Sequence, residues 1–195
     1  MKIALLGGTF DPPHLGHRKL CENFIAMMDF DLILIVPTYI PPHKIREGIS
    51  SGEDRFTMCS LAFEDVEKVE VSPLEIDRGG KSFSYDTLCA LKEQYPGSEM
   101  FFLMGTDMFR TFHEWYRYED VLALCKLCVC RRYEEDDVTN DILSPFSDRF
   151  IFCSAEPFEV SSTQIREKVK NGEDVSALLA PKVYDYIKTR KLYSK

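Results

Sequence analysis

The stretch "KIALLGGTFDPPHLGHRKL" (residues 2–20) joins an apolar run to a glycine pair, two prolines and two histidines. Its first part, residues 2–8, is apolar on both faces, which is typical of a strand covered on both sides of a parallel sheet. Helical spacing of apolar residues follows over residues 15–28. The polar residues therefore lie in the turn from a strand to a helix, and the glycines there let a ligand approach the backbone amides.

The same succession of strand and helix continues along the chain. Further short apolar runs predict strands at residues 31–37, 68–71, 99–105, 126–130 and 149–153. Helical patterns occupy residues 53–65, 84–95, 118–124, 162–171 and 181–190. The alternation predicts an α/β, Rossmann-like three-layer fold with a mainly parallel sheet and C-terminal helices. We expect one domain over residues 1–195, with a mobile loop at residues 38–54, which are rich in Pro, Gly and Ser.

Composition excludes several classes of partner. The formal net charge of −8 would repel nucleic acid and anionic lipid, so neither nucleic acid nor membrane is an expected partner. No apolar run approaches the ~18 residues that a membrane span requires, and the first one is too short for a signal-peptide core. We therefore expect a cytoplasmic protein.

Seven cysteines, an odd number, are expected to be free thiols in such a chain. Three of them, in "CKLCVC" (residues 125–130), begin with the spacing of a zinc knuckle. The second half of such a motif is missing, and a short apolar strand explains the same residues. We expect no metal site in the protein itself.

Ligands of parallel sheets bind beyond the carboxyl ends of the strands. The segments that follow the predicted strands here are "GGTFDPPHLGH" (7–17), "PTYIPPHK" (37–44), "GTD" (105–107), "RR" (131–132) and "SAEPFEVSSTQIR" (154–166). Most of the polar residues that could bind a ligand or take part in a reaction therefore lie at one edge of the sheet, the carboxyl ends of its strands. Two common phosphate motifs are absent: the first strand lacks GxGxxG, and "GGKS" (79–82) has Glu75 where a P-loop requires glycine.

The turn after the first strand is suited to phosphate. A helix that begins near His14 directs its N-terminal amides and positive dipole end toward the glycines. His14 and His17 are three residues apart and share a helical face, and Gly16 between them leaves room for a nucleotide. The alternative makes the histidines surface residues and the prolines simple turn formers.

A second phosphate site is predicted at "SSTQIR" (161–166), where Ser161 and Gln164 form a capping box. Ser162, Thr163 and Arg166 would face phosphates at that helix start. Capping alone leaves Arg166 unexplained, because a cation near a helix N-terminus opposes the dipole unless an anion lies there.

The stretch "GGTFDPPHLGH" resembles the HxGH signature of the nucleotidyltransferase superfamily, in the form found in bacterial nicotinate mononucleotide adenylyltransferases. The resemblance covers most of the chain. The later segments that carry it are "PPHK" (41–44), "RGGKSFSYDTL" (78–88), "FFLMGTDMF" (101–109), "HEWYRYED" (113–120), "VSSTQIR" (160–166) and "PKVYDYIKTRKLY" (181–193).

The resemblance implies a single nucleotidyltransferase domain whose substrates are ATP and nicotinate mononucleotide. The phosphate of the mononucleotide would attack the α-phosphorus of ATP, giving deamido-NAD and pyrophosphate, a step of NAD biosynthesis. Positioning and electrostatic stabilisation would supply catalysis without a covalent intermediate. Mg²⁺ would enter with ATP. A homo-oligomer is left open.

By motif position, the resemblance also implies roles for individual residues. The catalytic groups would be His14, His17 and Arg166. The ATP site would comprise Gly8, Thr9, Gly16, Asp107, Ser162 and Thr163. The nicotinate mononucleotide site would comprise Lys44, Ser84, Trp115, Tyr116 and Arg132.

One departure from the family pattern concerns the pyridine ring. The usual Ser-Tyr-Thr is Ser82-Phe83-Ser84 here, so Ser84 replaces the threonine expected to bind the nicotinate carboxylate. Three alternatives remain: a preference for nicotinamide mononucleotide, another acceptor such as a pantetheine phosphate, or a nucleotide sensor without catalysis. Trp115 and Ser84 favour a pyridine ring, and the intact histidines argue against a sensor.

Overall fold

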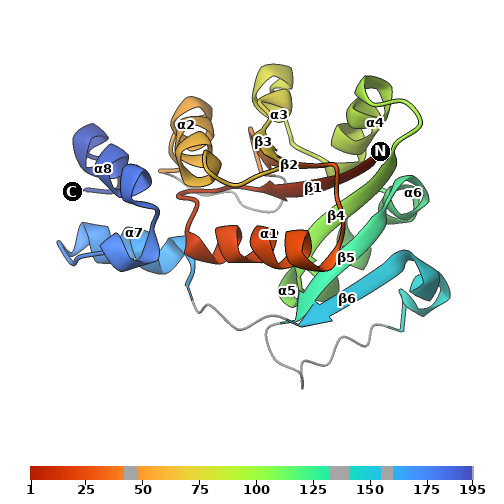
Figure 1. Cartoon of the computed structure of the whole chain (residues 1–195). Helices are drawn as coiled ribbons and strands as arrows, with labels where there is room; N and C mark the ends of the chain where they lie inside the picture. Colours follow the sequence, from red (N-terminus) through yellow and green to blue (C-terminus); the bar gives the residue numbers. More distant parts are fainter. Residues whose placement is uncertain (42–47, 132–140, 155–159, 195) are drawn as a thin grey trace.

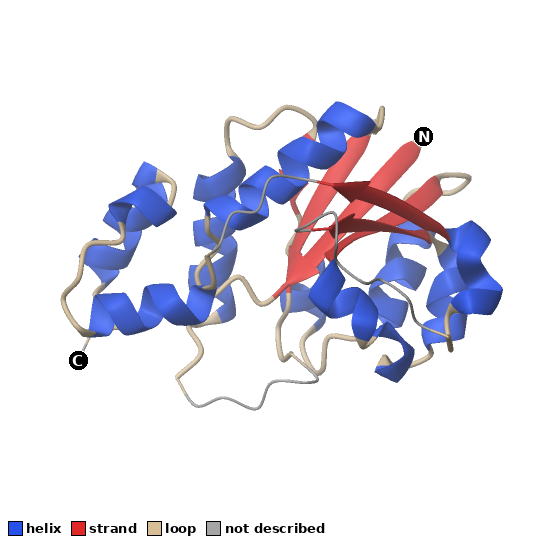
Figure 2. Ribbon diagram, turned by 90° about the horizontal axis from the view of Figure 1, so that it is seen from below, coloured by secondary structure: helices blue, strands red, loops and turns tan. Residues whose placement is uncertain are grey.

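A central sheet of six parallel strands lies between layers of helices (Figures 1 and 2). The computed structural model describes residues 1–41, 48–131, 141–154 and 160–194. The strands are β1 (Lys2–Gly8), β2 (Leu32–Pro37), β3 (Val69–Val71), β4 (Glu99–Gly105), β5 (Lys126–Arg131) and β6 (Phe150–Ser154). Each predicted strand is present to within one residue at either end.

The strand order is β3-β2-β1-β4-β5-β6, and every neighbouring pair is parallel. The chain builds outward from β1 to β3, returns to place β4 beside β1, and then builds outward on the other side. The connections after β1 and β4 therefore leave the sheet in opposite directions, which opens a crevice at their carboxyl ends. Gly8 and Gly105 lie at those two ends.

Six of the helices were predicted, with ends that agree within two residues. The helices are α1 (Leu15–Met27), α2 (Gly52–Phe63), α3 (Leu74–Arg78), α4 (Ser84–Gln94), α5 (Thr106–Arg110), α6 (Tyr118–Leu124), α7 (Ser162–Lys170) and α8 (Pro181–Arg190). The short 3-10 turns are η1 (Phe112–Glu114), η2 (Ser144–Arg149) and η3 (Ser176–Leu178). The unpredicted α3 and α5 have five residues each, too few to establish a helical period.

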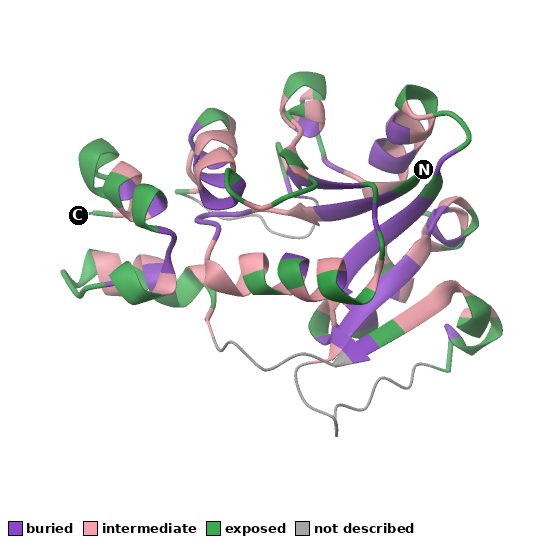
Figure 3. Ribbon diagram, viewed as in Figure 1, coloured by how far each residue is buried: buried purple, intermediate pink, exposed green. Residues whose placement is uncertain are grey.

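Alternate side chains of the strands point to opposite faces of the sheet and pack in two separate hydrophobic cores. Ala4 and Leu6 of β1 pack with α1, α2, α7 and α8, whereas Ile3 and Leu5 pack with α4, α5 and α6. The strands are accordingly the most buried part of the molecule, with β6 at the edge more exposed (Figure 3). Burial on both faces explains why these strands are nearly continuous apolar runs.

The cysteine-rich strand follows the same alternation, so the zinc-knuckle alternative is wrong. Cys125 packs in one core, while Cys128 and Cys130 pack in the other. Burial raises the pKa of both Cys125 and Cys128 to about 12, so these thiols stay protonated. All seven cysteines are free.

The part of the chain that the structure describes contains neither a metal-binding cluster nor a membrane-spanning helix. Within it, no three His, Cys, Asp or Glu side chains are grouped to hold a metal ion. Within the same residues, no helix combines the length and apolar character needed to cross a bilayer.

Candidate active site

A cavity of about 940 Å³ opens at the carboxyl ends of the central strands. Its wall includes all the predicted site residues that the structure describes. They are Gly8, Thr9, His14, Gly16, His17, Ser84, Asp107, Trp115, Tyr116, Ser162, Thr163 and Arg166. Lys44 and Arg132 lie outside the described residues, as do residues 42–47 of the predicted mobile loop.

The first turn of α1 places the two histidines together. His14 is the N-cap residue in an extended conformation, and its imidazole stacks on that of His17 with ring centroids 3.7 Å apart. The backbone N–H of His14 donates to Nδ1 of His17 at 3.1 Å. In a neutral imidazole one nitrogen accepts and the other donates, so this contact assigns the proton of His17 to Nε2.

Besides lining the cavity, Gly16 makes room for its neighbours within the protein. A Cβ atom at this position would lie 3.0 Å from Nδ1 of His14 and 3.1 Å from Cγ1 of Val160. The space beside Gly16 is therefore occupied by the protein, and the glycine allows the imidazole of His14 to fold back over the turn.

The ring of Phe10 packs against the paired histidines through His17. The φ angle of Phe10 is 51°, in the left-handed region that side chains other than glycine rarely adopt. Its ring meets the imidazole of His17 edge to face, with centroids 4.9 Å apart. A Cβ atom on Gly8 would lie 3.0 Å from the same ring, so Gly8 makes room for Phe10 as well as for a ligand.

The start of α7 contains the predicted capping box. Oγ of Ser161 accepts from the N–H of Gln164 at 3.2 Å, and Oε1 of Gln164 accepts from the N–H of Ser161 at 3.0 Å. The N-terminal turns of α1 and α7 both line the cavity. Two positive helix ends at one cavity favour an anionic ligand.

Two predicted phosphate ligands of α7 also hold the neighbouring turn. The hydroxyl of Ser162 donates to the carbonyl oxygen of Pro12 at 2.8 Å. Arg166 donates to the carbonyl oxygen of Asp11 at 2.6 Å and to Oγ1 of Thr163 at 2.9 Å. The argument that Arg166 has no role without an anion was therefore wrong, because the arginine also fastens α7 to the turn after β1.

The opposite side of the cavity is aromatic. Trp115 packs against Phe102 and Phe112, with ring centroids 5.5 Å and 5.1 Å apart, and also lines the cavity. It is therefore partly a core residue, which the polar sequence around it did not indicate. Tyr116 is half exposed and packs on Phe83, with centroids 4.7 Å apart.

Buried polar contacts support Ser84 at the first turn of α4. The hydroxyl of Thr87, in the same turn, donates to Oε1 of Glu75. Burial raises the pKa of Glu75, and hydrogen bonds to its neighbours oppose that shift. Oγ of Ser82 accepts from the N–H of Tyr39 at 2.9 Å. These contacts join α3, α4 and the segment after β2 behind Ser84.

Comparison with known proteins decides the family. The cytidylyltransferase-like family model matches residues 5–168. A probable nicotinate-nucleotide adenylyltransferase of Fusobacterium nucleatum is 39% identical over 184 residues, which cover 94% of this chain and 95% of that protein. One from Halalkalibacterium halodurans is 37% identical over 98% of this chain and 91% of its own. The chain belongs to the nicotinate-nucleotide adenylyltransferase family.

Solved structures agree with this family in fold. The nicotinic acid mononucleotide adenylyltransferase of Plasmodium falciparum, solved in complexes with APC and with NaAD, superimposes with a TM-score of 0.81 in both cases. The APC complex is 18% identical in sequence and covers 98% of this chain and 96% of that one. The adenylyltransferase fold is therefore kept where most of the sequence has changed.

Arg55 is a buried cation in this family member that the sequence analysis missed, and it is only 1% exposed. Its guanidinium donates to the carbonyl oxygens of Ser50, Thr9, Thr38 and Tyr39. Burial lowers the pKa of Arg55, and nearby negative charges oppose the shift. Arg55 thereby ties α2 to the segments after β1 and β2. A single arginine in an amphipathic helix gives no sequence signal for this role.

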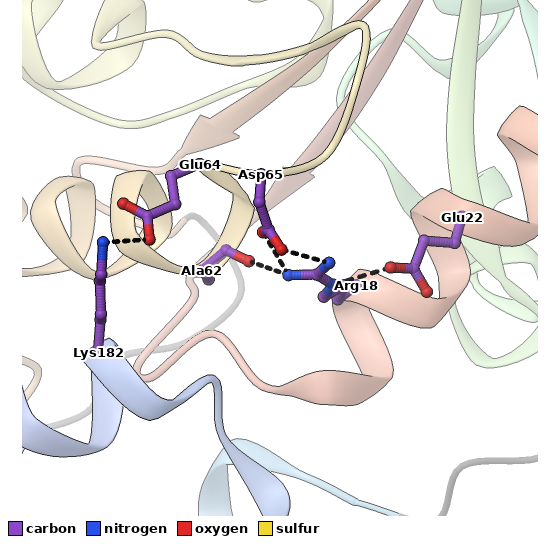
Figure 4. A network of polar contacts seen from close by, with 6 residues as sticks. All are labelled: Arg18, Glu22, Ala62, Glu64, Asp65 and Lys182. Atoms are coloured by element: carbon purple, nitrogen blue, oxygen red, sulfur yellow. Dashed lines mark hydrogen bonds and ion pairs between the residues drawn. The ribbon is translucent and has the colours of Figure 1, made fainter.

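Arg18, the residue after His17, fixes the start of α1 against α2 (Figure 4). Its guanidinium contacts both oxygens of Asp65 at 2.6 Å and 3.0 Å. Lys182 of α8 contacts the adjacent Glu64 at 2.6 Å. The Asp65 side chain is 65% exposed, so this pair contributes at most about 1 kcal/mol to stability. The contact joins α1 to the turn that follows α2.

Arg131 is a second cation of the cavity wall, next to the predicted Arg132. It is the last residue of β5 and lines the cavity. Its guanidinium lies 4.9 Å from the ring centroid of Phe152, and its buried Nε has no hydrogen-bond partner among the described residues. Arg131 therefore adds positive charge to the cavity wall.

Proposed function

We propose that this protein transfers the adenylyl group of ATP to nicotinate mononucleotide, which forms deamido-NAD and pyrophosphate in NAD biosynthesis. One observation carries the proposal: a single cavity has two helix N-termini and paired histidines on one side and Trp115, Tyr116 and Ser84 on the other. The first side suits a triphosphate, and the second suits an aromatic base. Family membership supplies the reaction that joins them.

The triphosphate of ATP would bind between the first turns of α1 and α7. Backbone amides at both helix starts would donate to phosphate oxygens. The helices already fix these donors, so they need not reorient as the reaction proceeds. Nε2 of His17 would donate to the α-phosphate, where charge develops as the mononucleotide phosphate attacks in line. Since His17 needs only to donate, it goes through no cycle of protonation. Asp107 would accept hydroxyls of the ATP ribose.

The leaving pyrophosphate would be stabilised by Arg166 and by the start of α7. Arg166 already donates to two groups of the protein, and a guanidinium has five donors, so it retains the capacity to contact phosphate. Ser162 and Thr163 contribute backbone amides, because the Ser162 hydroxyl is engaged with Pro12. Arg131 adds a further positive charge.

Nicotinate mononucleotide would occupy the aromatic side. The pyridine ring would lie against Trp115, which is held by its own contacts with Phe102 and Phe112. The carboxylate would accept from the hydroxyl of Ser84 and from the backbone amide of Tyr116. Lys44 and Arg132 keep their expected role at the mononucleotide phosphate.

ATP would enter as its Mg²⁺ complex. Mg²⁺ prefers substrate phosphates with water to a cage made wholly of protein ligands. The protein's part is to bind and orient that complex.

The test is pyrophosphate release from ATP with nicotinate mononucleotide, nicotinamide mononucleotide or phosphopantetheine as acceptor, with the dinucleotide product identified by mass. We expect deamido-NAD from the first acceptor at the highest rate. Faster product formation from phosphopantetheine would overturn the assignment of the acceptor. ATP binding without pyrophosphate release from any acceptor would point to the sensor alternative.

A further inference from the structure

The carboxylate of Asp11 lies where the turn after β1 meets the C-terminal segment. Asp11 is 2% exposed, and its Oδ1 accepts from the hydroxyl of Tyr193 at 2.7 Å. The backbone N–H of Ser50 donates to the same oxygen at 3.3 Å. A buried carboxylate depends on such donors, because it has left water. Residues 182 positions apart in the chain are thus joined directly beside the cavity.

The segment after α8 follows an unusual path to make this contact. Lys191 ends α8 with a φ angle of 52°, in the left-handed conformation that is common at helix C-termini. Tyr193, two residues later, also has a positive φ angle, 63°, which is costly for side chains other than glycine. The N–H of Leu192 donates back to Ile187 at 3.0 Å, which turns the chain toward the core. Such conformations persist where the surrounding contacts determine them, and the hydroxyl of Tyr193 makes one such contact.

The helix α8 itself is anchored separately. Tyr186 of α8 donates from its hydroxyl to Oδ1 of Asp54 at 2.8 Å, and Arg190 contacts that oxygen at 3.3 Å. Asp54 belongs to α2, which lies beside α8 (Figure 1). These two contacts attach α8 to α2 without Tyr193, whose hydroxyl donates to Asp11 instead.

The turn that Asp11 occupies holds the phosphate side of the site together. Its neighbour Phe10 meets His17 edge to face, and its own carbonyl oxygen accepts from Arg166 at 2.6 Å. The carbonyl oxygen of Pro12 accepts from Ser162 at 2.8 Å. A shift of Asp11 would therefore move the supports of α1 and of α7 together.

We propose that Tyr193 is a positioning residue for the phosphate side of the active site: through Asp11 it holds the turn that sets Phe10 against His17 and binds Ser162 and Arg166. Position 193 lies outside the segment that the family model matches, residues 5–168. The inference rests on the proposed use of this side of the cavity by ATP.

The protonation of Tyr193 supports this role. Burial, and after it the negative charge of Asp11, raises the pKa of Tyr193 above its ordinary value. The hydroxyl consequently remains a donor at every pH at which the protein is handled. The contact with Asp11 should therefore act as a fixed constraint.

The experiment compares Tyr193→Phe with Tyr186→Phe in the full chain. Both substitutions remove one hydroxyl that donates to a carboxylate, at 2.7 Å and 2.8 Å, and both lie in the C-terminal segment. Steady-state kinetics would be measured with ATP and nicotinate mononucleotide, the affinity for Mg²⁺-ATP by calorimetry, and Tm by thermal unfolding. The two variants differ in the carboxylate affected: that of Tyr193 is Asp11 in the turn after β1, whereas that of Tyr186 is Asp54 in α2.

We expect Tyr193→Phe to lower kcat/KM for ATP by about 10-fold and to weaken ATP binding similarly, as the loss of one hydrogen bond to a charged group does. The KM for the mononucleotide should stay within about twofold. Tyr186→Phe should lower Tm without changing the kinetics. In Asp11→Ala, which removes the acceptor of the Tyr193 hydroxyl, the added Tyr193→Phe should cause little further loss, because both act through one contact.

Three results would overturn the proposal: unchanged ATP binding in folded Tyr193→Phe, an equal kinetic loss in Tyr186→Phe, or losses that multiply in the double variant. Failure of the wild type to release pyrophosphate from any acceptor would instead refute the proposed function. The ATP affinities of the two tyrosine variants would still decide the role of Tyr193.

Discussion

The backbone N–H of His14 donates to Nδ1 of His17, 3.1 Å away, so the second histidine of the HxGH motif is a helix cap as well as a candidate donor. The contact uses one ring nitrogen to close the first turn of α1 and leaves Nε2 to carry the proton. Capping and catalysis are therefore assigned to different atoms of one side chain. Substitutions that preserve only one atom can separate them.

The first prediction replaces His17 by asparagine or glutamine. The side-chain amide of asparagine can reproduce the acceptor at the Nδ1 position, whereas that of glutamine can reproduce a donor near Nε2. We expect His17→Asn to fold with nearly unchanged Tm and to lose about 10²-fold or more in kcat, as the removal of a transition-state donor does. His17→Gln should keep more activity and lose more stability. Equal turnover in the two variants would contradict the assignment of the donor to Nε2.

The second prediction concerns Arg166. Arg166→Ala removes a guanidinium from the phosphate side and its hydrogen bond to Asp11, so kcat/KM for ATP should fall by about 10- to 10²-fold. The KM for nicotinate mononucleotide should change much less, since its proposed contacts come from α4 and from residues after α5. Lys168→Ala is the control, because this neighbouring cation pairs with Glu173 on the surface. Equal losses with both substrates would make Arg166 purely structural.

The sequence predicted the layers of the fold because the four inner strands are buried on both faces. Alternate side chains of β1, such as Ala4 and Leu5, enter different cores, so the strand is an uninterrupted apolar run that is easily recognised. The helices α3 and α5 were missed because five residues are too few to show a period. Their positions depend on tertiary contacts such as the hydrogen bond from Thr87 to Glu75.

In the candidate site, the residues that line the cavity could be predicted from the sequence, whereas the residues that hold them in place could not. Residues next to strand ends were placed on one rim by topology alone, and the described ones do line one cavity. Their supports were not predictable, because Arg55 and Tyr193 come from distant segments and act through backbone carbonyls or the single carboxylate of Asp11. Such partners follow no local spacing. The sequence therefore indicated which residues face a ligand and could not indicate what holds them.

The third prediction tests Arg55 by its effect on stability. Arg55→Lys keeps the charge but has three donors instead of five, so some of the buried carbonyl oxygens lose their partner. We expect the free energy of unfolding to fall by about 1–3 kcal/mol, and further in Arg55→Met. Arg149→Lys, at a loose and exposed pair with Asp148, should change it by no more than about 0.5 kcal/mol. Denaturant titration would measure all three, and similar values for Arg55→Lys and Arg149→Lys would refute the role.

The last prediction concerns the choice between the acid and the amide of the mononucleotide. The hydroxyl of Ser84 and the amide of Tyr116 are donors, which suit a carboxylate, whereas a carboxamide can present its own NH₂ to them. Hydrogen bonds that involve a charged group contribute roughly 1.5–3 kcal/mol each, so two of them predict a preference of about 10²-fold or greater for nicotinate mononucleotide.

Ser84→Ala should reduce this preference selectively while the rate with nicotinamide mononucleotide changes little. The side chain begins α4 without acting as its cap, so the helix should persist, and circular dichroism would check that it does. Trp115→Ala should harm both substrates, because it removes the stacking surface and opens a gap beside Phe102 and Phe112. Trp115→Phe should recover part of the rate with each, since a ring is restored. Equal kcat/KM for the acid and the amide in the wild type would show that these donors do not select the carboxylate, and would leave the transfer of the adenylyl group itself untouched.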